Sequence, residues 1–184
     1  MKSKLAIALG LIITVMSGCI TSLNPLYTDK DIIFKKELIG TWQDSKTNES
    51  WTFEKWEENG YKLSHKEEGE QATFLAVLVK IGDYMFLDLY PMETASKNSL
   101  KKMHQLPVHS FSKVTLSGNS LSLEMLNPEW LDKGLATESL QVQHSKTSDG
   151  RIILTATTSE LQSFMLAHAS MKEAFDEPLA LTKK

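Results

Sequence analysis

The sequence lacks most of the residues that common functional sites require. It has one cysteine, Cys19, and one arginine, Arg151, among 184 residues. A single thiol excludes a disulfide within the chain and any metal site built from several thiolates. Nucleic acid is not an expected partner, because arginine dominates phosphate and base recognition and the chain has no basic cluster of five or more residues.

Motifs for metal binding and hydrolysis are missing as well. The five histidines show neither zinc-ligand spacing nor a His-Glu-x-x-His pair, and we expect them to be scattered over surface or half-buried positions. They are His65, His104, His109, His144 and His168. No Gly-x-Ser-x-Gly occurs, although a triad can also come from unrelated positions. The sequence therefore predicts a protein that is not an enzyme and uses no metal or cofactor.

No apolar run is long enough to cross a bilayer, which takes about 20 residues. The longest greasy segment, from Leu5 to Val15, follows a basic start and precedes Ser17-Gly18-Cys19. This order resembles a bacterial lipoprotein signal peptide, with cleavage before Cys19 and diacylglycerol on its thiol. An ordinary secretory signal is the alternative, but it would not require the only cysteine to fall at the cleavage point.

That resemblance implies a domain organisation and an address. Residues 1–18 form the signal peptide, 19–30 a lipidated tether and 31–184 a single β-rich domain. After cleavage, residues 19–184 carry 18 basic and 23 acidic residues. Ile20 follows the cysteine in place of Asp, which favours the outer membrane, facing the periplasm, by resemblance to enterobacterial sorting. The expected partner is therefore the membrane, through the N-terminal lipid.

From Gly40 onward the pattern is that of β-strands. Ser50 to Trp56 alternates, and Asn59-Gly60 then gives a strong hairpin signal. The stretches 72–79 and 84–90 are almost wholly apolar, as in strands covered on both faces. Further strands are expected at 61–66, 108–116, 121–126, 140–144 and 151–156. The fold class is thus mainly β, an antiparallel β barrel or strongly curved sheet.

A helix is expected near the C-terminus. Thr157 and Glu160 have the spacing of a capping box, and an apolar face then recurs at helical spacing, so the helix should cover about 158–175. We expect it to lie against the sheet or plug a barrel end, with Pro178 closing the region. Short helical turns are expected at 129–135, at 31–38 and, as the alternative to a mobile loop, within 92–106.

The tripeptide Gly40-Thr41-Trp42, followed by antiparallel strands and a late helix, resembles the lipocalin and calycin group. This resemblance implies a barrel that holds a small apolar ligand, with Trp42 closing its floor and Arg151 packing over that ring. The chain also resembles uncharacterised bacterial lipoproteins. The matching segments are Asn24-Pro25-Leu26-Tyr27, Gly40-Thr41-Trp42, Phe86-Leu87-Asp88-Leu89-Tyr90-Pro91 and Leu154-Thr155-Ala156.

Asp88 is the most informative carboxyl group. It alternates with Leu87 and Leu89 and shares a strand face with Tyr84 and Phe86. Two readings are open. This face is either the outward side of an edge strand, or it points inward, so that Asp88 is a polar anchor in a ligand cavity lined by Tyr84 and Phe86.

The aromatic residues also fit two readings, a packed core or a cavity wall. Trp51 and Phe53 lie on one strand face and Trp56 on the other, so at least one face exposes an aromatic or lies under another element. We expect an envelope lipoprotein that binds a small apolar molecule or lipid. The alternative is a protein interaction or envelope assembly factor with a filled core, because a barrel of about eight strands either holds one small ligand or is filled by side chains.

Overall fold

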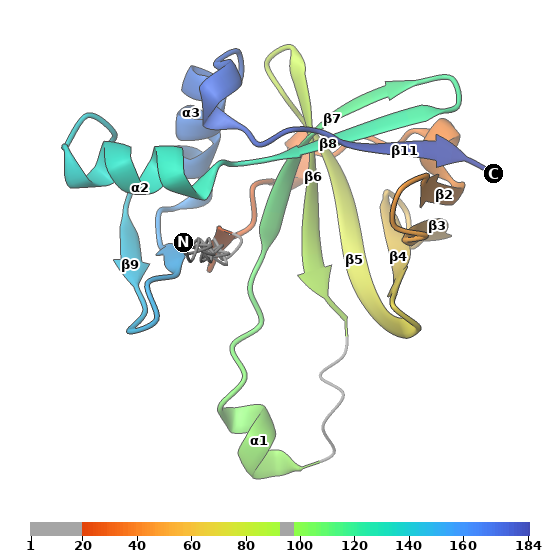
Figure 1. Cartoon of the computed structure of the whole chain (residues 1–184), viewed down its shortest axis with the longest axis horizontal. Coiled ribbons are helices and arrows are strands. Elements are labelled where there is room, and N and C mark those ends of the chain that lie inside the picture. The colour runs from red at the N-terminus through yellow and green to blue at the C-terminus, as the bar shows by residue number, and fades with distance from the viewer. Residues whose placement is uncertain (1–19, 93–97) are drawn as a thin grey trace, which may run out of the picture.

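The computed structural model describes residues 20–92 and 98–184. The predicted signal peptide 1–18, the lipidation site Cys19 and part of the predicted loop 92–106 lie outside the described residues. In Figure 1 a barrel of long strands lies beside a smaller group of helices and short strands. The two parts share a packed boundary, described below.

Eight antiparallel strands close into a barrel in the order β11-β2-β3-β4-β5-β6-β7-β8. They are β2 (Gly40–Asp44), β3 (Ser50–Trp56), β4 (Gly60–Glu67), β5 (Glu70–Ile81), β6 (Tyr84–Pro91), β7 (Ser110–Ser117), β8 (Ser120–Met125) and β11 (Leu179–Lys183). From β2 to β8 each strand pairs with the next one along the chain. The predicted fold class, mainly β with an antiparallel barrel, is confirmed.

The strand that closes the barrel follows Pro178, where the sequence analysis expects no further element. Leu181 of β11 pairs with Leu121 of β8 on one side and with Asp44 of β2 on the other. Its apolar alternation is only five residues long, and pairing with the two sheet edges between which it fits completes its specification.

A second layer covers one side of the barrel. It contains a three-stranded sheet in the order β1-β10-β9 and two helices. These elements are β1 (Thr21–Ser22), β9 (His144–Lys146), β10 (Ile152–Leu154), α2 (Pro128–Ala136) and α3 (Thr158–His168). The strand predicted at 140–144 is wrong over most of its length, because β9 begins only at His144. The predicted tether is also partly folded, since β1 pairs with β10 and Leu26 is fully buried.

The capping box of α3 is confirmed. Thr157 N–H donates to Glu160 Oε2 over 2.8 Å, and the Thr157 hydroxyl accepts from Glu160 N–H. The helix ends at His168, before the expected boundary near 175, and a 3-10 turn, η3 (Lys172–Ala174), carries the chain on. The apolar face of α3 packs against the outside of the barrel. The other short helical elements are η1 (Asp29–Asp31), η2 (Lys36–Leu38) and α1 (Ser99–Met103).

The molecule has two apolar cores, one on each side of the barrel wall. Side chains alternate along β6, so that Leu87 and Leu89 enter the barrel while Phe86 faces the second layer. In the outer core Phe86 packs with Phe164 and Met165 of α3. The nearly continuous apolar runs of β5 and β6 follow from this arrangement, because both faces of these strands are covered.

Candidate functional site

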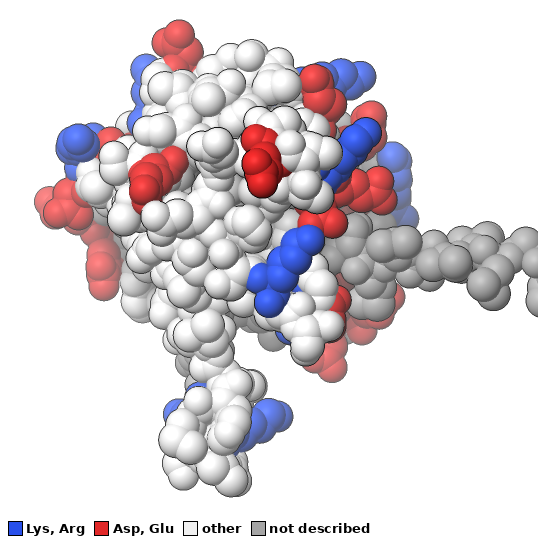
Figure 2. Space-filling view, turned by 90° about the vertical axis from the view of Figure 1, so that its left-hand side faces the viewer, with Lys and Arg blue, Asp and Glu red and all other residues white. Residues whose placement is uncertain are grey.

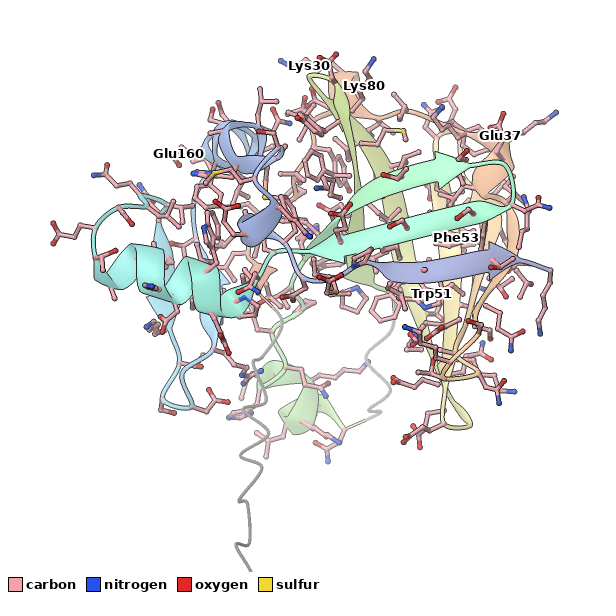
Figure 3. The ribbon with its side chains drawn as sticks, turned by 45° about the horizontal axis from the view of Figure 1, so that its top comes forward. Lys30, Glu37, Trp51, Phe53, Lys80 and Glu160 are labelled. Atoms are coloured by element: carbon pink, nitrogen blue, oxygen red, sulfur yellow. The ribbon has the colours of Figure 1, made fainter. Side chains whose placement is uncertain are left out.

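The barrel interior is the first place to look for a ligand site, and it is packed with side chains. A space that admits even a water molecule would leave accessible surface on the residues around it. Eight large inward-facing side chains of the described strands have relative exposures of 0–1%, and Trp51 and Leu89, which also face inward, are 5% and 8% exposed. The eight are Trp42, Phe53, Tyr61, Leu63, Leu78, Leu87, Leu121 and Leu123. Figure 3 labels Trp51 and Phe53, which β3 directs into this core.

One end of the barrel is closed by the segment between η1 and β2. The Phe34 ring stacks on the Tyr61 ring with centroids 5.0 Å apart, and Lys35 N–H donates to the Tyr61 hydroxyl over 2.6 Å. The same hydroxyl donates to the Lys35 carbonyl oxygen over 3.0 Å. Burial raises the pKa of Tyr61, which therefore stays a neutral donor and acceptor at this closure.

Trp42 lies at this closed end, as the lipocalin resemblance implies, but its cationic neighbour is not the expected one. The indole N–H donates to the Leu38 carbonyl oxygen over 2.8 Å, and the Trp42 side chain is fully buried. Lys183 of the last strand places its Nζ 5.0 Å from the centroid of the Trp42 ring. Its ammonium group also donates to the Glu37 carbonyl oxygen over 2.6 Å.

Arg151, predicted to pack over Trp42, lies elsewhere, and that expectation is wrong. It precedes β10 in the second layer and pairs its Nε with Asp149 Oδ2 over 2.9 Å in an exposed turn. The prediction failed because it took the strand containing Arg151 for the last one of the barrel. The alternation from Leu179 to Lys183 was the available signal for the true last strand.

Tyr84, Phe86 and Asp88 do not line the barrel interior. All three lie on the outer face of β6, which is a central strand between β5 and β7 rather than an edge strand. Asp88 is nevertheless 1% exposed, because the second layer covers this face. Both readings from the sequence are therefore corrected: the carboxyl group points outward from the barrel and is buried.

Asp88 accepts hydrogen bonds that hold the N-terminal segment onto the barrel. Leu26 N–H donates to Asp88 Oδ2 over 2.8 Å, and Nδ1 of His109 lies 2.7 Å from Asp88 Oδ1. The Tyr90 ring packs on the imidazole with centroids 4.6 Å apart. Burial, and then the nearby Asp88 carboxyl group, raise the pKa of Tyr27. The sequence analysis named His109 only as one of five scattered histidines and missed its contact with Asp88, because the two residues are 21 positions apart along the chain.

Asp88 and His109 resemble the carboxylate and the histidine of a hydrolase triad, but no serine hydroxyl is placed to complete it in the described part of the chain. Ser22 pairs with His109 through the backbone, but its hydroxyl donates to the Asn24 carbonyl oxygen over 2.8 Å. Both Ser22 and Asp88 are buried away from solvent, and His109 is nearly so. The geometry fits a structural link between layers better than a site open to substrate.

Residues 20–92 and 98–184 offer few other features from which a site could be built. Within these ranges no group of three or more His, Cys, Asp or Glu side chains is placed to hold a metal ion. None of the helices described there has the length and apolar character needed for a membrane crossing. A surface groove of about 500 Å³ lies between α2 and the chain leading into β9, and it is open and lined by mixed polar and apolar residues, including Glu138, Leu140 and Glu160.

Comparisons with known proteins add no family to these observations. No protein-family model, no curated protein and no solved structure matched the chain. The candidate features are therefore those of the chain's own geometry: a packed eight-stranded barrel, a Trp42–Lys183 closure and a buried Asp88–His109 link.

Proposed function

We propose that this protein is a lipid-anchored protein of the bacterial envelope that works without catalysis, through contacts made by its outer surface. The observation that carries the proposal is the packed barrel interior. Side chains that would line a ligand cavity are instead buried against one another. This packing favours an interaction or assembly factor over a carrier of apolar molecules.

The anchor part of the proposal rests on the sequence around Cys19. The basic start, the short apolar segment and the small residues before the only cysteine suit lipidation at that thiol. Only Ile20 and Thr21 lie between Cys19 and Ser22, whose backbone is bonded to His109. Three residues reach at most about 10 Å, so lipidation would hold the folded domain close to the bilayer.

Carriage of a small apolar ligand is the second candidate function. It is favoured by the closed barrel and by the basic side chain of the last strand over Trp42, which fit the lipocalin resemblance. It would require inward side chains such as Leu78 and Phe53 to move, because they occupy the space that the ligand would fill. Interiors packed at protein density resist such movement.

Native mass spectrometry of the full chain, isolated from membranes in mild detergent, tests the proposal. We expect the mass of the lipidated chain and no further small molecule. A stoichiometric apolar molecule, retained in addition to the covalent lipid, would contradict the proposal and support the carrier function.

Benzene binding to the same preparation, followed by NMR, gives a matched control. Leu78→Ala should open an apolar cavity in the barrel at a cost of about 2–5 kcal/mol, and such cavities bind benzene. We expect benzene to shift core resonances in Leu78→Ala and not in the wild type. Equal shifts in the two proteins would mean that the wild-type interior already has room for a ligand.

A further inference from the structure

The described part of the chain just before β7 projects from the barrel as an arm. We use the word arm for residues 98–107, which include α1. Every residue of the arm is exposed. Figure 1 shows α1 standing clear of the barrel, at the end of a long excursion from the sheet. A segment this exposed makes few contacts that would explain its composition by folding alone.

The arm carries three large apolar side chains into solvent. Leu100, Met103 and Leu106 are 63%, 74% and 65% exposed. They account for half of the six large apolar side chains that are exposed in the described part of the chain. Leu100 and Met103 are three residues apart in α1 and share one helix face. Clustered exposed apolar groups of this kind mark an interaction site.

The charge of the arm is opposite to that of the protein. Its formal charges are Lys101 and Lys102, and the sequence has no acidic residue between Glu93 and Glu124. The whole chain has more acidic than basic residues. On the face shown in Figure 2, the projecting arm carries blue lysines and no red. The turn between β4 and β5, which carries Glu67, Glu68 and Glu70, extends less far from the barrel than the arm does (Figure 1). Acidic side chains therefore do not reach as far from the barrel as the lysines of the arm.

The arm ends beside the point where the N-terminal segment joins the domain. Ser22 N–H donates to the His109 carbonyl oxygen over 2.9 Å, and His109 N–H donates back over 2.8 Å. His109 follows the arm by two residues, and Cys19 precedes Ser22 by three. Leu23, next to this junction, is 42% exposed. A lipid on Cys19 would therefore bring the bilayer surface to the base of the arm.

We propose that the arm docks on the anionic bilayer that holds the lipid anchor, an inference that rests on the proposed lipidation of Cys19. Leu100, Met103 and Leu106 enter the headgroup boundary, while Lys101 and Lys102 face the anionic headgroups. A lysine near an anionic surface strengthens binding about fivefold. The contact fixes the orientation of the barrel on the membrane, which a tether alone leaves free.

Fluorescence quenching on vesicles of phosphatidylethanolamine and phosphatidylglycerol tests this proposal. The full lipidated chain is reconstituted with an environment-sensitive label on Met103→Cys, which is the only free thiol once Cys19 carries lipid. The matched control is Lys80→Cys, an exposed position labelled in Figure 3 at the end of the barrel away from the arm. We expect lipid-attached nitroxide to quench the label at 103 severalfold more than the label at 80, and acrylamide in water to show the opposite preference.

Two further samples separate the sources of the signal. Two changes should each restore acrylamide access to the label on Met103→Cys: adding Lys101→Gln together with Lys102→Gln, or placing the Met103→Cys protein on vesicles of phosphatidylcholine alone. If the protein floats with the vesicles but the label at 103 is as accessible to acrylamide as the label at 80, the docking proposal is wrong and the lipid anchor is still supported. The arm would then face a protein. Protein that does not float with the vesicles overturns the anchor and the docking together.

Discussion

Lys183 and Trp42 join the last strand of the barrel to its first. Lys183 Nζ lies 5.0 Å from the Trp42 ring centroid and reaches the Glu37 carbonyl oxygen beyond it. The ammonium group thus has an aromatic face on one side and a hydrogen-bond acceptor on the other. Because β11 is short, we infer that this contact helps to hold the strand that closes the barrel.

Lys183→Met should therefore destabilise the protein. The substitution keeps an unbranched side chain, one atom shorter, but removes its cation–π contact and its hydrogen bond, at an expected cost of about 1–2 kcal/mol. Urea unfolding followed by tryptophan fluorescence measures the change. Lys184→Met is the matched control, because Lys184 is exposed and its recorded bond is from the backbone N–H to the Thr41 carbonyl oxygen. Equal losses in the two variants would rule out a special role for Lys183.

Gly40 makes room for this closure. A Cβ atom at position 40 would lie 2.9 Å from Lys183 Cε, and the backbone there has φ of +126°, which L-residues rarely adopt. Gly40→Ala should cost about 1–3 kcal/mol. The loss can come from the contact with Lys183 or from the backbone strain at position 40. Unfolding of Gly40→Ala in the Lys183→Ala background separates these causes, since Lys183→Ala removes the contact and leaves the backbone strain. A full loss in both backgrounds would assign the whole effect to the backbone.

Asp88→Asn should weaken the attachment of the second layer. The carboxylate accepts from Leu26 N–H with one oxygen and lies at hydrogen-bond distance from His109 with the other. An amide has one accepting oxygen, so it can serve Leu26 N–H only by turning its NH₂ group toward His109, which removes the charged acceptor there and forces a change of imidazole tautomer, at about 1–3 kcal/mol. Chemical unfolding measures this against Asp83→Asn, which removes the same charge from an exposed turn. Matching stabilities would show that the link contributes nothing.

The capping box of α3 should give the protein an acid-sensitive component of stability. Hydrogen bonds from the Thr157 hydroxyl and then from its backbone N–H hold the pKa of Glu160 below its ordinary value of 4.5. The folded state therefore binds fewer protons than the unfolded state in acid. The stabilisation is complete above the ordinary pKa and is lost as the pH falls through the lowered one.

Glu160→Gln removes this titration and keeps a side chain suited to the box. Wild type should be the more stable protein near neutral pH, and the difference should close as the pH falls below about 4.5. Thermal unfolding over a pH series measures it. Glu58→Gln, an exposed position in the turn after β3, corrects for the loss of one surface charge. A difference between wild type and Glu160→Gln that does not change with pH would contradict this account.

Cys19→Ala should abolish lipid attachment. Labelled fatty acid is expected to enter the wild-type chain in cells and not the variant, because the proposed acceptor of diacylglycerol is this thiol. The variant should also retain the segment 1–18, since lipid addition precedes cleavage in the pathway that this signal resembles. Label in both proteins would show that the lipid is carried elsewhere, and label in neither would favour the ordinary secretory signal.

Much of the barrel could be predicted from local pattern. The alternation from Ser50 to Trp56 and the Asn59-Gly60 turn predicted β3 and the hairpin that follows, and the structure places Trp56 outward at 37% exposure, as the alternation requires. The capping box located the start of α3 for the same reason, because its hydrogen bonds lie within four residues. Signals of this kind depend on neighbours in sequence.

The functional residues were harder to place. Trp42 was found through a short motif, but its partner Lys183 lies 141 positions along the chain. Arg151 was chosen instead, since β10 looked like the final strand. The side toward which Asp88 points could not be predicted from the sequence of β6, because both faces of that strand are apolar and both are covered.

The sequence by itself determined most of the strand and helix pattern and the mainly β class, and it predicts an address at Cys19, because each depends on contiguous residues. The tertiary structure alone decided that β11 closes the barrel, that side chains fill the interior, and that Asp88 meets His109 outside it. These features depend on which surfaces meet after the chain folds. Periodicity shows that a face is apolar, and only packing shows what covers it.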